Sequence, residues 1–180
     1  MTRAVVFGDG LAADPAAGLL GFARVLPPLL GWRGQVLGRP GPGFVKLPTD
    51  ERRPYASRLP ELQASGCDVV LVQVSGNDAR ADPAAVREAA EEFLAGAQAA
   101  VPVVHVLGPV WTPYEPRRLP ALRDLVAQVC ADRGLLFVDG LGWLSPSLIA
   151  ADGEHPTRRG HLRIATRTAS AVRAGSRSPA

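Results

Sequence analysis

Short, continuous apolar runs alternate with longer amphipathic stretches along the 180 residues of the chain. Five of these runs are rich in valine and leucine: Ala4–Phe7, Gln35–Leu37, Asp68–Val74, Val103–Leu107 and Leu135–Val138. Continuous apolar runs are typical of parallel strands that are buried on both faces, because a half-exposed strand would alternate apolar and polar side chains. The pattern therefore predicts five parallel strands.

The stretches between the runs carry signals for helices. Asp14-Pro15 and Asp82-Pro83 each place a capping residue before a proline at the first helical position, and Thr157 is a third candidate cap. We expect the first helix to run toward Leu30, and the other two caps to begin helices of their own. A fourth helix is predicted over an apolar stripe that ends near a glycine stop: Leu119, Leu122, Val126, Val129 and Gly134.

Strands that alternate with helices predict a three-layer α/β/α sandwich around a five-stranded parallel sheet. We expect one domain over residues 1–173, because no internal repeat or linker interrupts the chain, and a flexible tail over residues 174–180. Ligands of such sheets bind outside the carboxyl ends of the strands. The loops that matter most for function are therefore Gly8–Ala13, Gly38–Phe44, Ser75–Ala81, Gly108–Tyr114 and Gly140–His155.

The composition is typical of a soluble globular protein, with 47% hydrophobic and 21% charged residues. No apolar stretch is long enough to span a membrane, and the N-terminus shows no secretory signal, so we expect a cytoplasmic protein. Cys67 and Cys130 lack metal-ligand spacing and are expected to be buried free thiols.

The net charge of +3 is too small to indicate a nucleic-acid partner. Arginines gather near the C-terminus, and we interpret them as the solvated face of a helix and a tail, because nucleic-acid binding would add interleaved aromatic residues. These arginines are Arg158, Arg159, Arg163, Arg167, Arg173 and Arg177. The expected partner is a small molecule, with neither nucleic-acid binding nor insertion into a membrane, and the sequence does not indicate an oligomeric state.

Two of the loops after strands carry residues that suit catalysis. Asp152 and His155 lie three positions apart, so the carboxylate can accept a hydrogen bond from one imidazole nitrogen and leave the other nitrogen free as a base. Asn77 can donate its side-chain NH2 to an oxyanion, and glycines of a neighbouring loop can donate backbone N–H groups. Each motif alone is better explained as an ordinary turn or helix entry. His161, in a helix, and His105, in an apolar strand, are expected to be structural.

Together, and in this order, the segments resemble the SGNH hydrolases, also called the GDSL-type esterase and lipase superfamily. The first block is "FGDGL", where the family has Gly-Asp-Ser-Leu after a strand. "GRPGPGF" supplies the glycine of the second block, for which we select Gly41. "SGND" matches the third block at Asn77, and "DGEHPTRRGH" matches the last block at Asp152 and His155. The resemblance spans residues 4–170.

The resemblance implies a flavodoxin-like sheet and hydrolysis of a carboxylic ester through a serine acyl-enzyme, with no cofactor and no metal. His155 is then the general base and Asp152 orients it. The oxyanion hole is expected to consist of Gly41, Asn77 and the N–H at the nucleophile position, Gly10. The chain has no room for a large lid domain, which favours a short acyl or acetyl group in the substrate.

Four further residues are expected around this small ester: Asp9, Gly43, Trp111 and Tyr114. Asp9 is also expected to point into the protein and stabilise its turn. The two aromatic side chains fit a wall that contacts the substrate and fit ordinary packing equally well.

The chain departs from the family at the nucleophile, because position 10 is glycine. Other hydroxyls do not replace the serine in an obvious way: Ser75 is expected on the oxyanion side, and Ser145 and Ser147 precede Asp152 in a loop of unknown path. Either the glycine was substituted to silence an active enzyme, or the chain is a natural pseudoenzyme that binds a ligand or a partner.

The retained Asp152 and His155 favour the silenced enzyme, because a chain that has long been inactive has no reason to keep them. A third alternative is a flavodoxin-like module that binds a nucleotide or a flavin. The first loop, "GDGLAAD", does not favour it, because this loop lacks a run of glycines and hydroxyls for phosphate.

Overall fold

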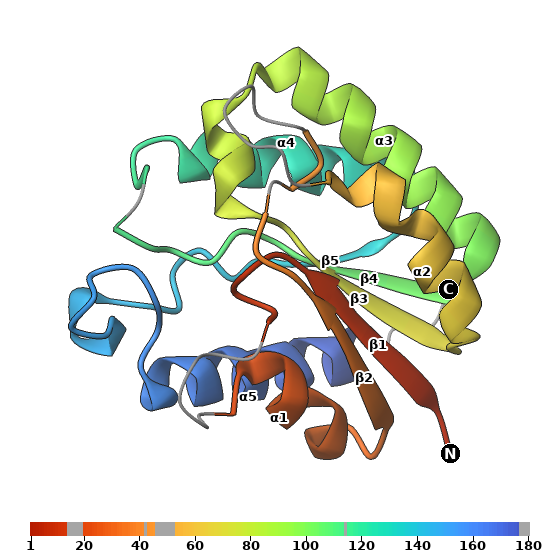
Figure 1. Cartoon of the computed structure of the whole chain (residues 1–180), viewed down its shortest axis with the longest axis horizontal. Coiled ribbons are helices and arrows are strands. Elements are labelled where there is room, and N and C mark those ends of the chain that lie inside the picture. Colours follow the sequence, from red (N-terminus) through yellow and green to blue (C-terminus); the bar gives the residue numbers. More distant parts are fainter. Residues whose placement is uncertain (14–19, 42, 46–52, 114, 177–180) are drawn as a thin grey trace.

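The fold is that of a computed structural model, which describes residues 1–13, 20–41, 43–45, 53–113 and 115–176. Five parallel strands form one sheet in the order β2-β1-β3-β4-β5 (Figure 1). Their bounds are Arg3–Gly8 (β1), Arg33–Gly38 (β2), Val69–Gln73 (β3), Val103–Leu107 (β4) and Leu136–Val138 (β5). All five predicted strands are confirmed, each to within two residues at either end.

Helices cover both faces of this sheet, as the alternation of elements predicts. On one face, α1 (Phe22–Leu29) and α5 (Arg158–Gly175) pack against each other. The other face is covered by α2 (Leu59–Ser65), α3 (Pro83–Ala100) and α4 (Leu119–Asp132) (Figure 1). Short 3-10 helices lie in the connections: η1 (Tyr55–Arg58), η2 (Gly76–Arg80) and η3 (Pro146–Leu148). The three-layer α/β/α architecture is confirmed.

Successive residues of β1 point into two separate hydrophobic clusters. Phe7 packs on the side of α2 and α3 against Tyr55 and Phe93, with ring centroids 5.1 Å apart in both pairs. Val6 belongs to the cluster on the side of α1 and α5. Because β1 is buried from both sides, its side chains do not alternate between apolar and polar, which explains the continuous apolar run in the sequence.

Side-chain caps fix the starts of α3 and α5. The Asp82 carboxylate accepts a hydrogen bond from the amide of Ala85 at 3.1 Å, and the Thr157 hydroxyl accepts one from the amide of Gly160 at 3.2 Å. Both predicted caps are thus confirmed. The predicted stop after α4 is also present, because Gly134 has a φ of 65°, which favours glycine.

The start of α1 differs from the prediction. The expected cap at Asp14-Pro15 lies outside the described residues, but a helix that runs unbroken from there is wrong. Gly21 has an extended backbone, with φ −65° and ψ 159°, and α1 begins only at Phe22. The amide of Phe22 donates to the Nδ1 atom of His161 in α5 at 3.3 Å, so a tertiary contact helps to set this helix start.

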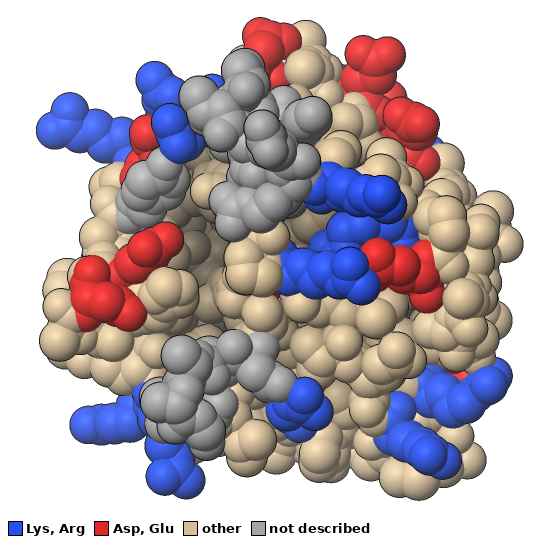
Figure 2. All heavy atoms as spheres, viewed as in Figure 1, with Lys and Arg blue, Asp and Glu red and all other residues tan. Residues whose placement is uncertain are grey.

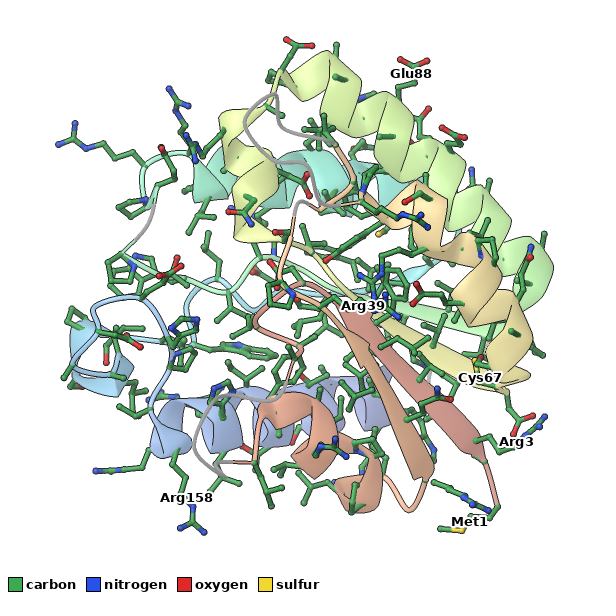
Figure 3. All side chains as sticks on the ribbon, in the orientation of Figure 1. Met1, Arg3, Arg39, Cys67, Glu88 and Arg158 are labelled. Carbon is green, nitrogen blue, oxygen red and sulfur yellow. The ribbon has the colours of Figure 1, made fainter. Side chains whose placement is uncertain are left out.

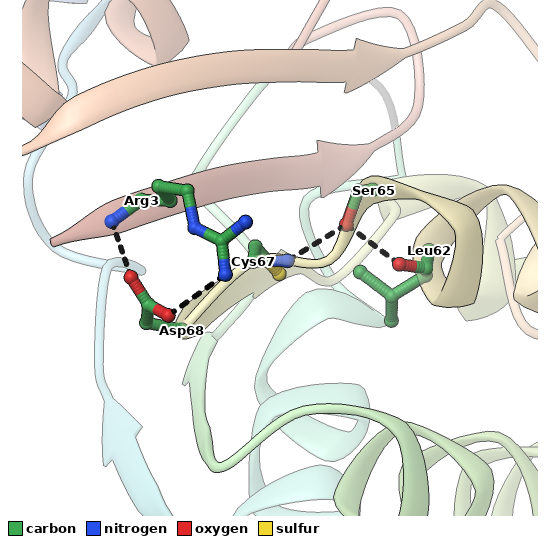
Figure 4. Close-up of polar contacts among 5 residues, drawn as sticks. All are labelled: Arg3, Leu62, Ser65, Cys67 and Asp68. Carbon is green, nitrogen blue, oxygen red and sulfur yellow. Dashed lines mark hydrogen bonds and ion pairs between the residues drawn. The ribbon is translucent and has the colours of Figure 1, made fainter.

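The sequence patterns missed α2, which is short and has no side-chain cap. At its end the Ser65 hydroxyl donates to the Leu62 carbonyl at 2.6 Å, and the amide of Cys67 donates to this hydroxyl (Figure 4). Beside it, the amide and the guanidinium of Arg3 donate to the Asp68 carboxylate at 2.7 and 3.2 Å. These contacts secure α2 and β1 to the start of β3, away from the carboxyl ends of the strands.

Three further expectations concern the whole chain. Cys67 and Cys130 are buried and free, as predicted. The expected tail, residues 174–180, overlaps the end of α5 at Gly175, and its residues 177–180 lie outside the described part. Among the described residues, no helix is long and apolar enough to cross a membrane.

Candidate active site

The loop after β1 is anchored through Asp9, whose side chain is 7% exposed. Its carboxylate accepts hydrogen bonds from the amide of Leu11 at 2.8 Å and from the hydroxyl of Ser75, and its own amide donates to Gln73. Burial raises the pKa of the Asp9 carboxyl, and the bonds from Ser75 and Leu11 oppose that rise. Asp9 therefore points inward, as expected, and both oxygens are engaged by the protein.

Asn77 joins the loop after β3 to the loop after β2. Its side-chain NH2 donates to the carbonyl of Gly41 at 3.0 Å, and its backbone amide donates to the hydroxyl of Ser75 at 3.2 Å. An NH2 group carries two hydrogens, so one remains for another acceptor. The structure thus brings together Gly41 and Asn77, which the sequence assigns to one oxyanion hole.

Gly43 lies against a buried carboxylate on the same side. The two oxygens of Asp78 accept hydrogen bonds from the amides of Phe44 at 3.0 Å and Val45 at 3.1 Å. A Cβ atom at position 43 would lie only 2.0 Å from the Asp78 Oδ2 atom and 2.6 Å from the Ser75 Cβ atom. Gly43 therefore permits the close approach through which Asp78 holds this loop.

Replacing Gly43 by alanine is expected to destabilise the fold. The added methyl group displaces the Asp78 carboxylate from its two backbone donors, and overpacking together with lost hydrogen bonds costs roughly 2–4 kcal/mol. Urea unfolding of Gly43→Ala measures the loss. Gly142→Ala is the matched control, because a Cβ atom there meets nothing within 4 Å. Equal stability of the two variants would contradict the prediction.

Asp78 also predicts a dependence of stability on pH. Burial raises the pKa of its carboxyl from 3.8 to about 7, although the two backbone bonds lower it. Between these values the folded chain binds a proton that the unfolded chain does not, so this contribution to stability is present at low pH and is lost as the pH rises through 7. Between about pH 5 and about pH 8 the loss amounts to about 2–3 kcal/mol.

Urea unfolding of the native chain and of Asp78→Asn at both pH values isolates this contribution. Burial also raises the pKa of Asp9, which changes stability with pH in the same direction as Asp78 does. Burial lowers the pKa of His105 and His161, which changes stability with pH in the opposite direction. His105 and His161 are present in both proteins and cancel in the comparison, whereas the charge of Asp9 also raises the pKa of Asp78, so the difference reports this pair of carboxyls. An identical change of stability with pH in the two proteins would show that Asp78 does not titrate in this range.

Asp152 and His155 form the pair that their spacing predicts. The Oδ2 atom of Asp152 lies 3.0 Å from the Nδ1 atom of His155. The Oδ1 atom accepts hydrogen bonds from the amides of Glu154 at 2.9 Å and His155 at 3.0 Å. The three bonds lower the pKa of the Asp152 carboxyl to about 2. The carboxylate is thus charged at neutral pH, and its bond to Nδ1 leaves Nε2 as the free nitrogen.

The loop that carries this pair packs into the same end of the molecule as the loop after β1. The loop closes on itself, because the amide of Thr157 donates to the carbonyl of Leu148 at 2.8 Å. Leu144 and Leu148 belong to the same hydrophobic cluster as Ala12 of the β1 loop. In Figure 1 the blue segment before α5 lies beyond the carboxyl ends of the strands. The Asp152–His155 pair and the Gly41–Asn77 contact therefore lie at one end of the sheet.

Gly10 sits at the turn after β1, where it is partly exposed. A Cβ atom there would lie 3.7 Å from the Cα atom and 4.0 Å from the Cβ atom of Pro40, which are ordinary contact distances. Neither packing nor backbone thus requires glycine at this position, in contrast to Gly43. The three serines considered as replacements for the missing nucleophile differ in how exposed they are. Ser75 is 0% exposed, whereas Ser145 and Ser147 are exposed and hydrogen-bonded to each other.

Arg58 is a buried support of the site that the sequence patterns missed. Its guanidinium is 4% exposed, donates to the carbonyls of Gly8 at 3.0 Å and Leu37 at 2.6 Å, and lies 4.4 Å from the ring centroid of Phe7. It thereby joins the ends of β1 and β2, the strands that lead into the first two loops. A single arginine at the start of a short helix carries no signal of this role.

The remaining candidate residues have simpler places. Trp111 is partly buried and packs against the cluster on the side of α1 and α5, and Tyr114 lies outside the described residues. His161 is 3% exposed inside α5, and His105 is half-buried on β4, so both lie within the fold as predicted. Among the residues that the structure describes, no three His, Cys, Asp or Glu side chains are grouped so that they could hold a metal ion.

A parallel α/β sheet with an Asp-His pair in a loop beyond the carboxyl ends of its strands is compatible with a hydrolytic enzyme. The chain belongs to the GDSL-like lipase/acylhydrolase family, whose model matches residues 6–163. The match confirms the resemblance read from the sequence blocks and favours it over a nucleotide-binding module.

Solved structures share this fold at low sequence identity. A catalytic mutant of Axe2, an acetylxylan esterase from Geobacillus stearothermophilus, superposes with a TM-score of 0.77 and 17% identity, over 95% of this chain and 94% of that chain. TesA superposes with a TM-score of 0.76 and 22% identity, over 96% of this chain and 98% of that chain. No curated protein sequence matches the chain.

Proposed function

We propose that the chain hydrolyses short acyl or acetyl esters slowly, with His155 as general base and with Gly41 and Asn77 as oxyanion donors. The observation that carries this proposal is the Asp152–His155 contact of 3.0 Å, supported by two backbone bonds to the same carboxylate. The names of similar structures support an ester substrate, because Axe2 is an acetylxylan esterase with catalytic mutants at a serine and at an aspartate.

The attacking group in this proposal is water, because Gly10 has no hydroxyl. His155 takes a proton from water through Nε2 while the water oxygen bonds to the ester carbonyl carbon. The carbonyl oxygen becomes an oxyanion, which the free N–H of Asn77 and backbone N–H groups at Gly41 and Gly10 stabilise. The C–O bond to the alcohol then breaks, and the alcohol leaves with the proton from the imidazolium. The products are a carboxylic acid and an alcohol.

Hydrolysis of p-nitrophenyl acetate by the native chain tests this proposal. An oxyanion hole and a base without a nucleophile can retain roughly 10³–10⁴-fold acceleration over water. We expect a low rate above buffer that His155→Ala removes. Glu154→Gln is the control, because it alters an exposed side chain of the same loop and keeps the backbone donor to Asp152. A rate that survives in His155→Ala would contradict the role of this base.

A second candidate function is that of a pseudoenzyme, which binds an acyl ligand or a partner without cleaving it. The observation that favours it is Gly10 itself, because this position accommodates a side chain and yet carries none. On this alternative the native chain shows no hydrolysis above buffer, and a folded Gly10→Ser variant shows none either. The two functions thus differ in the outcome of one substitution.

A further inference from the structure

The exposed face of α5 carries arginines that have no acidic partner. The side chains of Arg158, Arg159, Arg163 and Arg167 are exposed, and none of them forms an ion pair or a hydrogen bond within the described part of the chain. The sequence of α5 contains no Asp or Glu. Several arginines elsewhere form ion pairs, such as Arg3 with Asp68 at 3.2 Å. Unpaired positive charge is therefore concentrated on this helix.

The exposed charges of α5 and of α3 differ in sign, because α5 carries arginines without acids and α3 carries three glutamates and one arginine. In Figure 2 the edge along α1 and α5 shows basic side chains, whereas the edge along α3 shows mainly acidic ones. Arg158 and Glu88 lie on opposite sides of the molecule in Figure 3 and both point away from it. The modest net charge of +3 thus conceals a basic helix, α5, and a predominantly acidic one, α3.

Exposed leucines accompany these arginines. Leu162 is 50% exposed and follows Arg158 by four residues, so both lie on the same side of α5. Leu20 is 62% exposed and lies two residues before Phe22, whose amide contacts His161 of α5 at 3.3 Å. These two are among the few large apolar side chains that the described chain exposes, and both lie near the first turns of α5.

We propose that this basic face, defined as Arg158, Arg159, Leu162, Arg163 and Arg167 with Leu20 beside it, docks on an anionic lipid surface. Arginines near such a surface attract its headgroups, and exposed leucines can enter the boundary between headgroups and acyl chains. The leucines favour lipid over nucleic acid, which would leave them in water. Single-stranded nucleic acid would also require aromatic side chains for stacking, and α5 has none.

Docking in this way orients the candidate active site. The basic face begins at Arg158, three residues after His155, so the loop with the Asp152-His155 pair lies next to the lipid. The interaction is peripheral and agrees with the lack of a membrane-spanning helix among the described residues. It revises the interpretation of these arginines as a merely solvated face, and it does not depend on whether the chain hydrolyses esters.

Sedimentation with vesicles tests the proposal on the full native chain. We expect binding to vesicles in which about a third of the phosphatidylcholine is replaced by phosphatidylglycerol, and none to phosphatidylcholine alone. Binding is expected to weaken strongly between about 10 mM and about 150 mM salt, because the screening length falls from about 30 Å to about 8 Å. Absence of binding to the anionic vesicles at low salt would overturn the proposal.

Charge-matched variants locate the surface. The triple variant Arg159→Gln, Arg163→Gln, Arg167→Gln is expected to bind at least about tenfold more weakly, because each arginine near an anionic surface contributes roughly a fivefold factor. The control removes the same charge from arginines that are paired on other elements: Arg3→Gln, Arg87→Gln and Arg118→Gln. Its binding should change much less, and an equal loss would overturn the assignment to α5.

Two further measurements separate lipid docking from other interactions. Leu162→Ser keeps every charge and is expected to weaken vesicle binding about threefold or more, whereas attraction of charge alone would leave binding unchanged. Duplex DNA at the same salt serves as a competing polyanion. Tighter binding to duplex DNA than to the anionic vesicles, with the same dependence on α5, would overturn the choice of lipid as the partner.

Discussion

Gly10→Ser is expected to raise the rate of acetyl-ester hydrolysis by about 10³-fold or more over that of the native chain. A serine hydroxyl at this turn would attack the carbonyl directly and form an acyl-enzyme, which replaces one slow attack by water with two faster steps. Loss of the nucleophile from a complete serine site costs about 10⁶-fold in kcat in a well-studied protease, so its restoration in a supported site has a large effect.

The fold can accommodate a side chain at position 10. A Cβ atom at position 10 makes only ordinary contacts with Pro40, at 3.7 and 4.0 Å, and the backbone there does not favour glycine. We therefore expect the variant to unfold at nearly the same urea concentration as the native chain. The carboxylate of Asp9 remains bonded to Leu11 and Ser75, so the turn keeps its shape.

Two variants distinguish a restored nucleophile from a general change at the turn. Gly10→Ala adds the same Cβ atom without the hydroxyl and is expected to stay at the native rate. Gly10→Ser combined with His155→Ala should lose the gain, because the hydroxyl then has no base. Mass spectrometry of Gly10→Ser mixed with p-nitrophenyl acetate should show one added acetyl group. A folded Gly10→Ser no faster than Gly10→Ala would refute the silenced esterase and favour the pseudoenzyme.

The strands and the later helices were predictable because local pattern and tertiary structure agree there. β1 and β3 read as apolar runs because both faces of each strand are buried, and Asp82 and Thr157 cap helices with their own side chains. The start of α1 was not predictable in the same way. The extended Gly21 precedes Phe22, whose amide donates a hydrogen bond to His161, 139 residues further along the sequence. No local sequence pattern indicates such a contact.

The candidate site likewise contains local contacts, which were predictable, and long-range contacts, which were not. Asp152 and His155 bond to each other three residues apart, so the contact is local, but the spacing alone is weak evidence and the resemblance of the last block to the family was needed to predict the pair. The buried network beneath the loops was not predictable, because its partners come from different strands. Asp78 holds the amides of Phe44 and Val45, and Arg58 joins two carbonyls that belong to separate strands. Such residues appear in the sequence only as ordinary charged positions.

Asp152→Asn in the Gly10→Ser protein is expected to lower kcat by about 10²–10³-fold. The Oδ1 atom of Asp152 accepts two backbone amides, so an asparagine keeps its oxygen there and turns its NH2 toward the Nδ1 atom of His155. The Nδ1 atom must then accept a hydrogen bond, and the imidazole proton moves to Nε2, the nitrogen that should take the proton from the serine. An equivalent change in a fully buried triad costs about 10⁴-fold.

The smaller factor follows from exposure, because the side chains of Asp152 and His155 are 51% and 53% exposed. Water can stabilise the second tautomer of the imidazole and so restores part of the activity. Asp139→Asn is the matched control, since the Asp139 carboxylate also bonds a backbone amide two residues on, at 3.0 Å, and pairs with Arg123. We expect its kcat to stay within about a factor of three of the parent Gly10→Ser protein, the scale of a surface ion pair.

The dependence of kcat on pH tests the same mechanism separately. Three hydrogen bonds lower the pKa of the Asp152 carboxyl to about 2, so this group stays charged throughout the range in which the protein is assayed. The activity of Gly10→Ser above about pH 4 should therefore show no step that comes from titration of Asp152. In Asp152→Asn the reduced kcat should persist at high pH, because the defect is the wrong tautomer of a neutral imidazole. An unchanged kcat in Asp152→Asn would instead mean that neither the charge nor the hydrogen bond of Asp152 supports the base.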